Sequence, residues 1–148
     1  MQRGFTIIEL LICIAVLGLI VSMAALTLQP SLAQQELEST ARQLAADIRL
    51  LQQLSINSGA NAVAYALLFT QTSPYGYYIT ANTQMIKHAV FPKSVRLSGN
   101  CTLIFFNSSG TPVMGAQTIS LYSTTLKTLR YVILAPVTGR VRISQSLQ

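Results

Sequence analysis

Residues 4–28 of the chain read GFTIIELLICIAVLGLIVSMAALTL. From Leu10 to Leu28 this segment contains neither a charged residue nor a proline. A helix of this length rises about 28 Å at roughly 1.5 Å per residue, which is close to the roughly 30 Å hydrocarbon core of a bilayer. We therefore expect a membrane-spanning helix over residues 5–29.

A secretory signal peptide is the alternative interpretation, because a short basic region containing Arg3 precedes the apolar run. The run is longer than the roughly 7–15 residues of a signal-peptide core, however, and Glu9 lies at its start. A small-residue cleavage site is at best weak, since Ser31-Leu32-Ala33 follows Pro30. The anchor is favoured, and Arg3 before the span predicts a cytoplasmic N-terminus with an exported C-terminal part.

Glu9 is the unusual residue of this segment. An ionised carboxylate near the hydrocarbon costs several kcal/mol unless something compensates its charge, so such a residue is a functional candidate. The alternative is that Glu9 reaches the headgroups from its place at the end of the run.

Gly4-Phe5-Thr6-Ile7-Ile8-Glu9 followed by an apolar helix resembles the processing signature of type IV prepilins and type II secretion pseudopilins. The resemblance implies that residues 1–4 are a leader, that a prepilin peptidase cuts after Gly4, and that Phe5 becomes the N-methylated first residue. It also implies that Glu9 neutralises the N-terminal ammonium of a neighbouring subunit during filament assembly. The implied partners are other pilins or pseudopilins, the prepilin peptidase and an inner-membrane assembly platform.

The same resemblance implies a location. It predicts a bacterial inner-membrane protein with a single span, whose C-terminal domain is exported to the periplasm or cell exterior and which enters a filament after assembly. One residue departs from the family pattern, since many pilins carry a proline near the position of Leu26 and this chain has Pro30 instead.

An amphipathic pattern follows Pro30. Apolar residues recur at spacings of four and three, which is typical of one face of a helix; they are Leu37, Ala41, Leu44, Ile48 and Leu51. Glu38 and Arg42 are spaced to form an i,i+4 ion pair on another face, and Gly59 is suited to ending the helix in the left-handed conformation. We expect one nearly continuous helix from Phe5 to about Ile56, with an amphipathic part over residues 30–59.

Residues 60–148 carry the signals of short strands rich in β-branched and aromatic residues, separated by turn-forming residues. The connections are too short for helical crossovers, which predicts antiparallel pairing. The expected fold is α+β, with the long helix packed on one antiparallel sheet or on two small sheets, as in pilins. The predicted strands are Ala62–Phe69, Tyr75–Thr80, Gln84–Val90, Ser94–Ser98, Cys101–Asn107, Thr118–Ser123, Leu129–Ala135 and Arg140–Ser144.

Charge is sparse and uneven in this chain of 148 residues, which is 51% hydrophobic and 9% charged. No acidic side chain follows Asp47, so from residue 60 onward seven cationic side chains have no acidic residue to offset them in sequence. Such a domain cannot build the paired-carboxylate site of a glycosidase or a carboxylate-rich calcium site. Those cations are Lys87, Lys93, Arg96, Lys127, Arg130, Arg140 and Arg142.

The sequence offers few candidate residues for catalysis. His88 is the single histidine, and the chain contains no serine-hydrolase, zinc-protease or phosphate-loop motif. Cys13 and Cys101 lack the spacing of a zinc site, and a disulfide between them is not expected if one lies in the membrane and the other outside it. We expect no catalytic residues, no cofactor and no metal.

The C-terminal part resembles the GspH/FimT group of minor pseudopilins. The residues that carry this resemblance are Leu103-Ile104-Phe105-Phe106, Ser109-Gly110-Thr111, Arg130-Tyr131-Val132-Ile133 and Gly139-Arg140-Val141-Arg142-Ile143. The resemblance implies a minor subunit of a type II secretion pseudopilus or type IV pilus.

The excess of cationic side chains after residue 60 suggests a second function. Alternation along a strand places Arg140 and Arg142 on one face, outward and near Tyr131, and Val141 and Ile143 on the inner face with Val132 and Leu134. Guanidinium groups beside an aromatic ring suit phosphate contact and base stacking, and Gly139-Arg140-Val141-Arg142 resembles a stretch of DNA-binding minor pilins. The alternative functions are DNA uptake through Arg140, Arg142, Arg130 and Lys127, or simple protection of an edge strand.

Overall fold

The computed structural model describes residues 6–59 and 63–146, with side chains omitted for residues 23–27. The chain divides into two compact units, Met1–Leu32 and Ala33–Gln148, and each is described by itself. Helix α1, Ile7–Ser58, contributes to both. Its extent agrees with the predicted nearly continuous helix, although Phe5 lies outside the described residues.

Helix α1 continues through Pro30 and ends where the sequence predicted. Pro30 lies inside the helix, two residues before the division between the units. After Ser58, Gly59 has a φ of 55°, the left-handed conformation that favours glycine at a helix end.

The predicted membrane span over residues 5–29 falls in the first part of α1, apart from Phe5 and Thr6. Among the described residues, no helix meets the combined length and hydropathy required to cross a bilayer.

In the second unit, one face of α1 is buried, as the sequence predicted. Each of the five periodic apolar residues is at most 2% exposed; they are Leu37, Ala41, Leu44, Ile48 and Leu51. The predicted pair on the exposed face is also confirmed, since Arg42 Nη2 lies 2.7 Å from Glu38 Oε1. Such exposed pairs contribute about 0.3–0.5 kcal/mol, so the buried apolar face is what fixes the helix.

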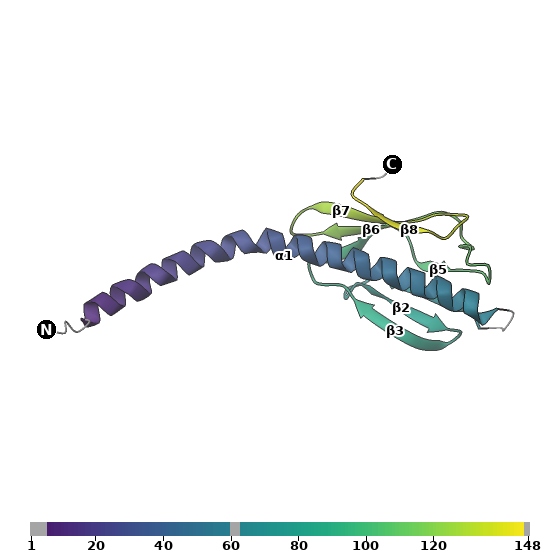
Figure 1. The fold of residues 1–148 in the computed structure, drawn as a ribbon, viewed down its shortest axis with the longest axis horizontal. Helices are drawn as coiled ribbons and strands as arrows, with labels where there is room; N and C mark the ends of the chain where they lie inside the picture. The colour runs from purple at the N-terminus through teal and green to yellow at the C-terminus, as the bar shows by residue number, and fades with distance from the viewer. Residues whose placement is uncertain (1–5, 60–62, 147–148) are drawn as a thin grey trace. The chain divides into compact units, whose positions relative to one another are not determined.

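Within residues 63–146, eight strands form two antiparallel four-stranded sheets (Figure 1). The first has the order β3-β2-β1-β5, and the second β4-β6-β7-β8. All eight predicted strands are present; β3 has the predicted ends, and one or both ends of the other seven are shifted, with Ala62 of the first prediction outside the described residues. Their bounds are β1 Tyr65–Thr70, β2 Gly76–Ala81, β3 Gln84–Val90, β4 Val95–Ser98, β5 Leu103–Phe105, β6 Gln117–Ser123, β7 Thr128–Leu134 and β8 Val141–Ser144.

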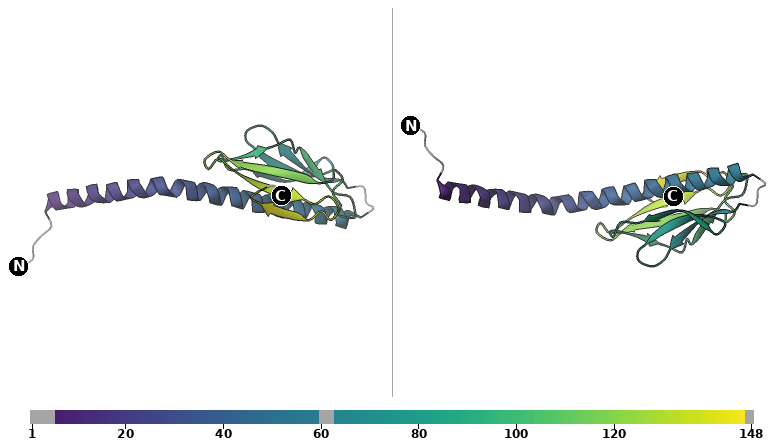
Figure 2. Two further views of the ribbon diagram at one scale, coloured as in Figure 1. Left: turned by 90° about the horizontal axis from the view of Figure 1, so that it is seen from above. Right: turned by 90° about the horizontal axis from the view of Figure 1, so that it is seen from below.

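The chain exchanges sheets between consecutive strands. Strand β4 pairs with β6, whereas the next strand, β5, returns to pair with β1. Both sheets therefore contain a strand from the middle of the sequence, and residues 33–58 of α1 lie across both of them (Figures 1 and 2). The shared core includes Ile48 of the helix, Ile79 of the first sheet and Leu121 of the second, each 0% exposed.

Polar contacts also hold α1 to the second sheet and its loops. Arg49 Nη2 donates to the carbonyl oxygen of Val141 at 3.2 Å. Gln52 Nε2 donates to the carbonyl oxygens of Gly110 at 2.7 Å and Thr138 at 3.3 Å. The helix thus satisfies backbone acceptors in two loops and at the start of β8.

Strand β8 corrects one prediction. Val141 joins the core with Val132 and Leu134, as expected, and is 4% exposed. Ile143 is 39% exposed, although it is paired with the fully buried Val132. Because β8 is the outermost strand of its sheet, no further strand from the described residues pairs beyond it to cover Ile143.

Candidate functional site

The N-terminal motif begins outside the described residues, where Gly4 and Phe5 lie. The structure describes Thr6 and Glu9. The backbone N–H of Glu9 lies 3.1 Å from the Thr6 carbonyl oxygen and 3.4 Å from Thr6 Oγ1. Thr6 therefore caps the start of α1, and Glu9 occupies the third helical position, where a carboxylate is also favoured by the helix dipole.

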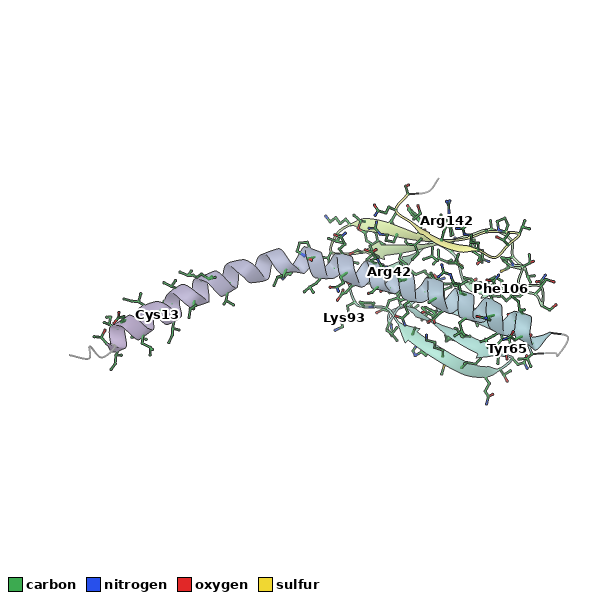
Figure 3. All side chains as sticks on the ribbon, in the orientation of Figure 1. Cys13, Arg42, Tyr65, Lys93, Phe106 and Arg142 are labelled. Carbon is green, nitrogen blue, oxygen red and sulfur yellow. The ribbon has the colours of Figure 1, made fainter. Side chains whose placement is uncertain are left out.

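The surface around Glu9 is apolar and uncovered within the first unit. Glu9 is exposed, and the large apolar side chains between residues 7 and 21 are between 50% and 82% exposed. Cys13 lies among these side chains (Figure 3) and is a free thiol. A helix that is apolar on all sides requires burial by something outside the unit.

Comparison with protein families assigns this segment. Residues 1–25 match the family model of the prokaryotic N-terminal methylation motif. The chain therefore carries the type IV prepilin-like signal, and its α+β fold, a long N-terminal helix packed on antiparallel sheets, is consistent with pilin-like architecture. No curated protein and no solved structure matches the chain.

The motif also bears on the class of protein. It supports a type IV pilin-like protein, and suggests a structural subunit rather than an enzyme. In the described part of the chain, no group of three or more histidine, cysteine, aspartate or glutamate side chains is placed to hold a metal.

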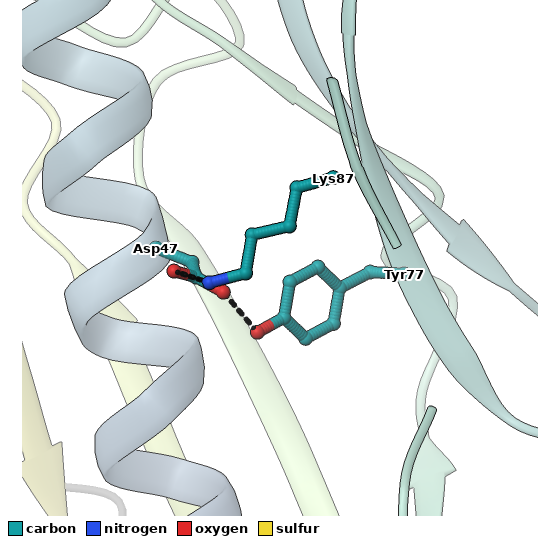
Figure 4. A network of polar contacts seen from close by, with 3 residues as sticks. All are labelled: Asp47, Tyr77 and Lys87. Carbon is teal, nitrogen blue, oxygen red and sulfur yellow. Dashed lines mark hydrogen bonds and ion pairs between the residues drawn. The ribbon is translucent and has the colours of Figure 1, made fainter. Parts of the chain in front are cut away.

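A buried polar cluster joins α1 to the first sheet (Figure 4). The Tyr77 hydroxyl donates to Asp47 Oδ2 at 2.6 Å, and Lys87 Nζ lies 2.6 Å from Asp47 Oδ1. The Asp47 side chain is 6% exposed and that of Lys87 39% exposed. Burial, reinforced by the hydrogen bond to Asp47 and the charge of that residue, raises the pKa of Tyr77 far above its ordinary value.

This cluster was not predicted from the sequence, and it corrects the expectation that no acidic residue offsets the cations after residue 60. Lys87 was counted among the cations without an acidic residue to offset it, but it is paired with Asp47, forty residues earlier. Nothing local in the sequence signals this pair. A hint was available in the position of Asp47 next to Ile48 of the buried helix face, where a lone carboxylate needs a partner.

The four basic residues proposed for DNA contact do not form one group. Arg140 and Arg142 are both exposed and line a shallow depression with Ile133 and Ala135. Arg142 lies opposite Ile133 across the β7–β8 pair, on the outer face of the sheet (Figure 3).

Arg130 and Lys127 lie elsewhere. Arg130 is paired with the buried Leu121 and shares its side of the sheet with Val132 and Leu134, so it lies at the end of the inner face. Lys127 is in the turn between β6 and β7 with a φ of 55°. Only Arg140 and Arg142 are brought together.

Cys101 is a free thiol beside the first residues of β5. Its Sγ lies 3.4 Å from Gln117 Oε1. Burial raises the pKa of this thiol to about 11, so the reactive thiolate is scarce near neutral pH. Cys101 is therefore poorly suited to act as a nucleophile near neutral pH.

Proposed function

We propose that the chain is a minor pilin or pseudopilin of the GspH/FimT type, a structural subunit of a type II secretion pseudopilus or type IV pilus. The prepilin peptidase cleaves after Gly4, and Phe5 is N-methylated. The observation that carries this proposal is the methylation motif at residues 1–25, placed directly at the start of an apolar helix.

The apolar surface of the first unit supports this function. At about 25 cal/mol per Å² of apolar area buried, covering side chains such as Ile7, Leu11 and Leu17 is strongly favourable. In the proposed life cycle the inner membrane covers this surface first, and the helices of other subunits cover it in the filament. The second unit is exported to the periplasm or cell exterior.

Glu9 supplies the specific contact in this scheme. Its carboxylate is close to the new N-terminus in sequence and has no ion pair among the described residues. An opposite charge on a neighbouring subunit would neutralise it where water is scarce, and such a pair is stabilising only when both charges are present. The partners are other pilins, the prepilin peptidase and the inner-membrane assembly platform.

Changing Glu9 to alanine tests the role of the carboxylate. We expect the variant to enter the membrane normally, because the apolar segment is unaltered, and to be incorporated into filaments or N-methylated less than the wild type. Mass spectrometry of the mature N-terminus and the amount of protein in sheared filaments are the measurements.

Glu38→Ala is the matched control, since Glu38 is an exposed helical carboxylate in the second unit that forms only an i,i+4 pair. It should assemble like the wild type. Assembly of Glu9→Ala at the wild-type level would remove the proposed role of the charge, and an intact Met1 in cells that contain the peptidase would overturn the proposed function itself.

A DNA-binding minor pilin of a DNA-uptake machine is the second candidate function. The juxtaposition of Arg140, just before β8, and Arg142, within it, along one shallow depression favours it, because two guanidinium groups suit phosphate contact. Arg130 and Lys127, which were also predicted to contact DNA, lie apart from this pair and are not part of the proposed site.

The double variant Arg140→Gln/Arg142→Gln tests this candidate. If the pair binds phosphates, affinity of the full-length protein for DNA should fall steeply with salt, and the double variant should lose most of that affinity and reduce the salt slope by about 2. Fluorescence anisotropy with a labelled duplex measures both. Arg130→Gln/Lys127→Gln serves as the charge-matched control, and equal losses in the two double variants would contradict a site at Arg140 and Arg142.

A further inference from the structure

Strand β3 is an outer strand of the first sheet, and its side chains leave an apolar edge uncovered. Among the strands that the structure describes it pairs with β2 alone, at one end of the order β3-β2-β1-β5. Met85, Ile86 and Val90 are 63%, 51% and 53% exposed. An exposed edge strand with apolar side chains is a template for pairing with another chain.

The backbone of β3 offers hydrogen-bonding groups on its open side. The N–H of Phe91 donates to the carbonyl oxygen of Tyr75 at 2.8 Å, so this residue pair is hydrogen-bonded. Hydrogen-bonded and non-hydrogen-bonded pairs alternate in an antiparallel ladder. Val90, opposite Gly76, and His88, opposite Tyr78, therefore direct their N–H and C=O groups away from β2.

The usual protection of an edge is weak here. Lysine commonly guards an outer strand, but the ammonium of Lys87 is bound to Asp47 on the inner side. A register shift after Ile79 disturbs the pairing only near Ile86. In contrast, strand β4 carries Arg96, β8 carries Arg142, and β5 has only three residues.

A groove continues from the end of β3. Val90 is the last residue of β3 and also lines the groove. The groove has a volume of about 560 Å³. Pro74, Tyr75 and Pro92 provide its apolar walls, and Lys93 and Arg96 its charge. This volume lies within the roughly 300–1,000 Å³ that is usual for ligand-binding clefts.

The cations of the groove lack acidic partners in the part of the chain that the structure describes. The ion pairs there join Arg42 to Glu38 and Lys87 to Asp47, not Lys93 or Arg96. The carboxylate of Glu36 accepts a hydrogen bond from the hydroxyl of Ser94, which lies between the two cations in sequence. No ion pair joins Glu36 to either of them among the described residues. Both Lys93 and Arg96 are exposed (Lys93 in Figure 3).

We propose that the β3 edge and this groove bind an extended segment of another protein in which acidic residues alternate with apolar ones. The segment adds as a strand beside β3 through the outward groups of His88 and Val90. Its apolar side chains cover Met85 and Val90, and its carboxylates lie over Lys93 and Arg96. Main-chain pairing supplies affinity, and the charges select an acidic partner. This interaction does not depend on the filament role.

The acetylated, amidated hexapeptide VEVEVE is a direct probe, with VKVKVK as its charge-reversed control. Both are titrated into the full-length ¹⁵N-labelled protein in detergent micelles. We expect the largest amide shifts at residues 85–96 and at Tyr75, slower hydrogen exchange at His88 and Val90, and binding of the acidic peptide at least about tenfold tighter than that of the basic one.

Two variants separate the contributions. His88→Pro removes an outward N–H without removing a bond to β2, so it should weaken binding by about tenfold or more while the amide spectrum of the other strands is retained. Arg96→Glu is a surface change that tests the charge if the first variant does not fold, and it should weaken binding by a similar factor of about ten. Arg130→Gln, outside the groove, should bind like the wild type.

Several results would overturn the proposal. They are equal binding of the two peptides, no binding at millimolar peptide, shifts centred away from residues 85–96, or unchanged binding by Arg96→Glu. Stronger binding of hexathymidylate at the same residues would reassign the groove to nucleic acid. Cleavage after Gly4 and methylation of Phe5 are measured separately from peptide binding. A failure of peptide binding would therefore not contradict the proposed filament function.

Discussion

Asp47→Ala is expected to lower the free energy of unfolding by about 2–3 kcal/mol, because two groups lose their partner at once. The Tyr77 side chain belongs to a residue only 1% exposed, so its hydroxyl would be left without its acceptor. Lys87 would lose its counter-charge, although its 39% exposure lets water compensate part of the loss. Urea unfolding followed by tyrosine fluorescence measures the effect, since the chain contains no tryptophan.

Two variants show whether the carboxylate is the centre of the cluster. Tyr77→Phe removes only the hydroxyl and leaves the ion pair, and Lys87→Gln leaves the hydrogen bond. Each is expected to cost about 1 kcal/mol. If Asp47→Ala cost no more than Lys87→Gln, the hydrogen bond from Tyr77 would contribute nothing and the cluster would be a surface ion pair.

Gly139→Ala is expected to destabilise the protein by about 3 kcal/mol or more, from a left-handed backbone and a steric clash together. Gly139 has a φ of +64°, and a Cβ there would lie 2.6 Å from the carbonyl oxygen of Gly110 and 2.4 Å from Gln52 Nε2. The Gln52 side chain can move, but only by giving up its hydrogen bonds to Gly110 and Thr138. The Gly110 backbone must then shift as well.

Gly115→Ala is the matched control for the conformational part. Gly115 has a similar φ of +73°, and nothing lies within 4 Å of an added Cβ. It should therefore cost only about 1 kcal/mol, the penalty for a left-handed alanine. Thermal or urea unfolding of both variants gives the difference, which measures the close approach of the two loops; equal losses would contradict the clash.

Local periodicity in the sequence was sufficient to predict the elements of the second unit. The three-and-four spacing from Leu37 to Leu51 identified the buried face of the helix, and runs of β-branched residues identified the strands. The sheet exchange between β4 and β5 could not be read in this way. A short connection between β4 and β5 is compatible with a hairpin and equally with a passage from one sheet to the other, so its length does not reveal their partners.

The candidate sites show the same division between local and distant information. The methylation motif is a run of adjacent residues, so it was found directly. The pairing of Asp47 with Lys87 depends on tertiary packing, which no local pattern encodes. Arg130 is an intermediate case: it was predicted to act with Arg142, although its alternation with Val132 and Leu134 could have placed it on the inner face, as the strand pairing does.

The polar contacts of α1 have a mechanical consequence. Asp47 fastens the helix to β2 and β3, while Arg49 and Gln52 fasten it to the start of β8 and its loop. These attachments lie within two turns of one another along the helix but reach different sheets. A pulling force on this part of α1 is consequently resisted by polar contacts with both sheets at once, rather than by contacts with one sheet alone.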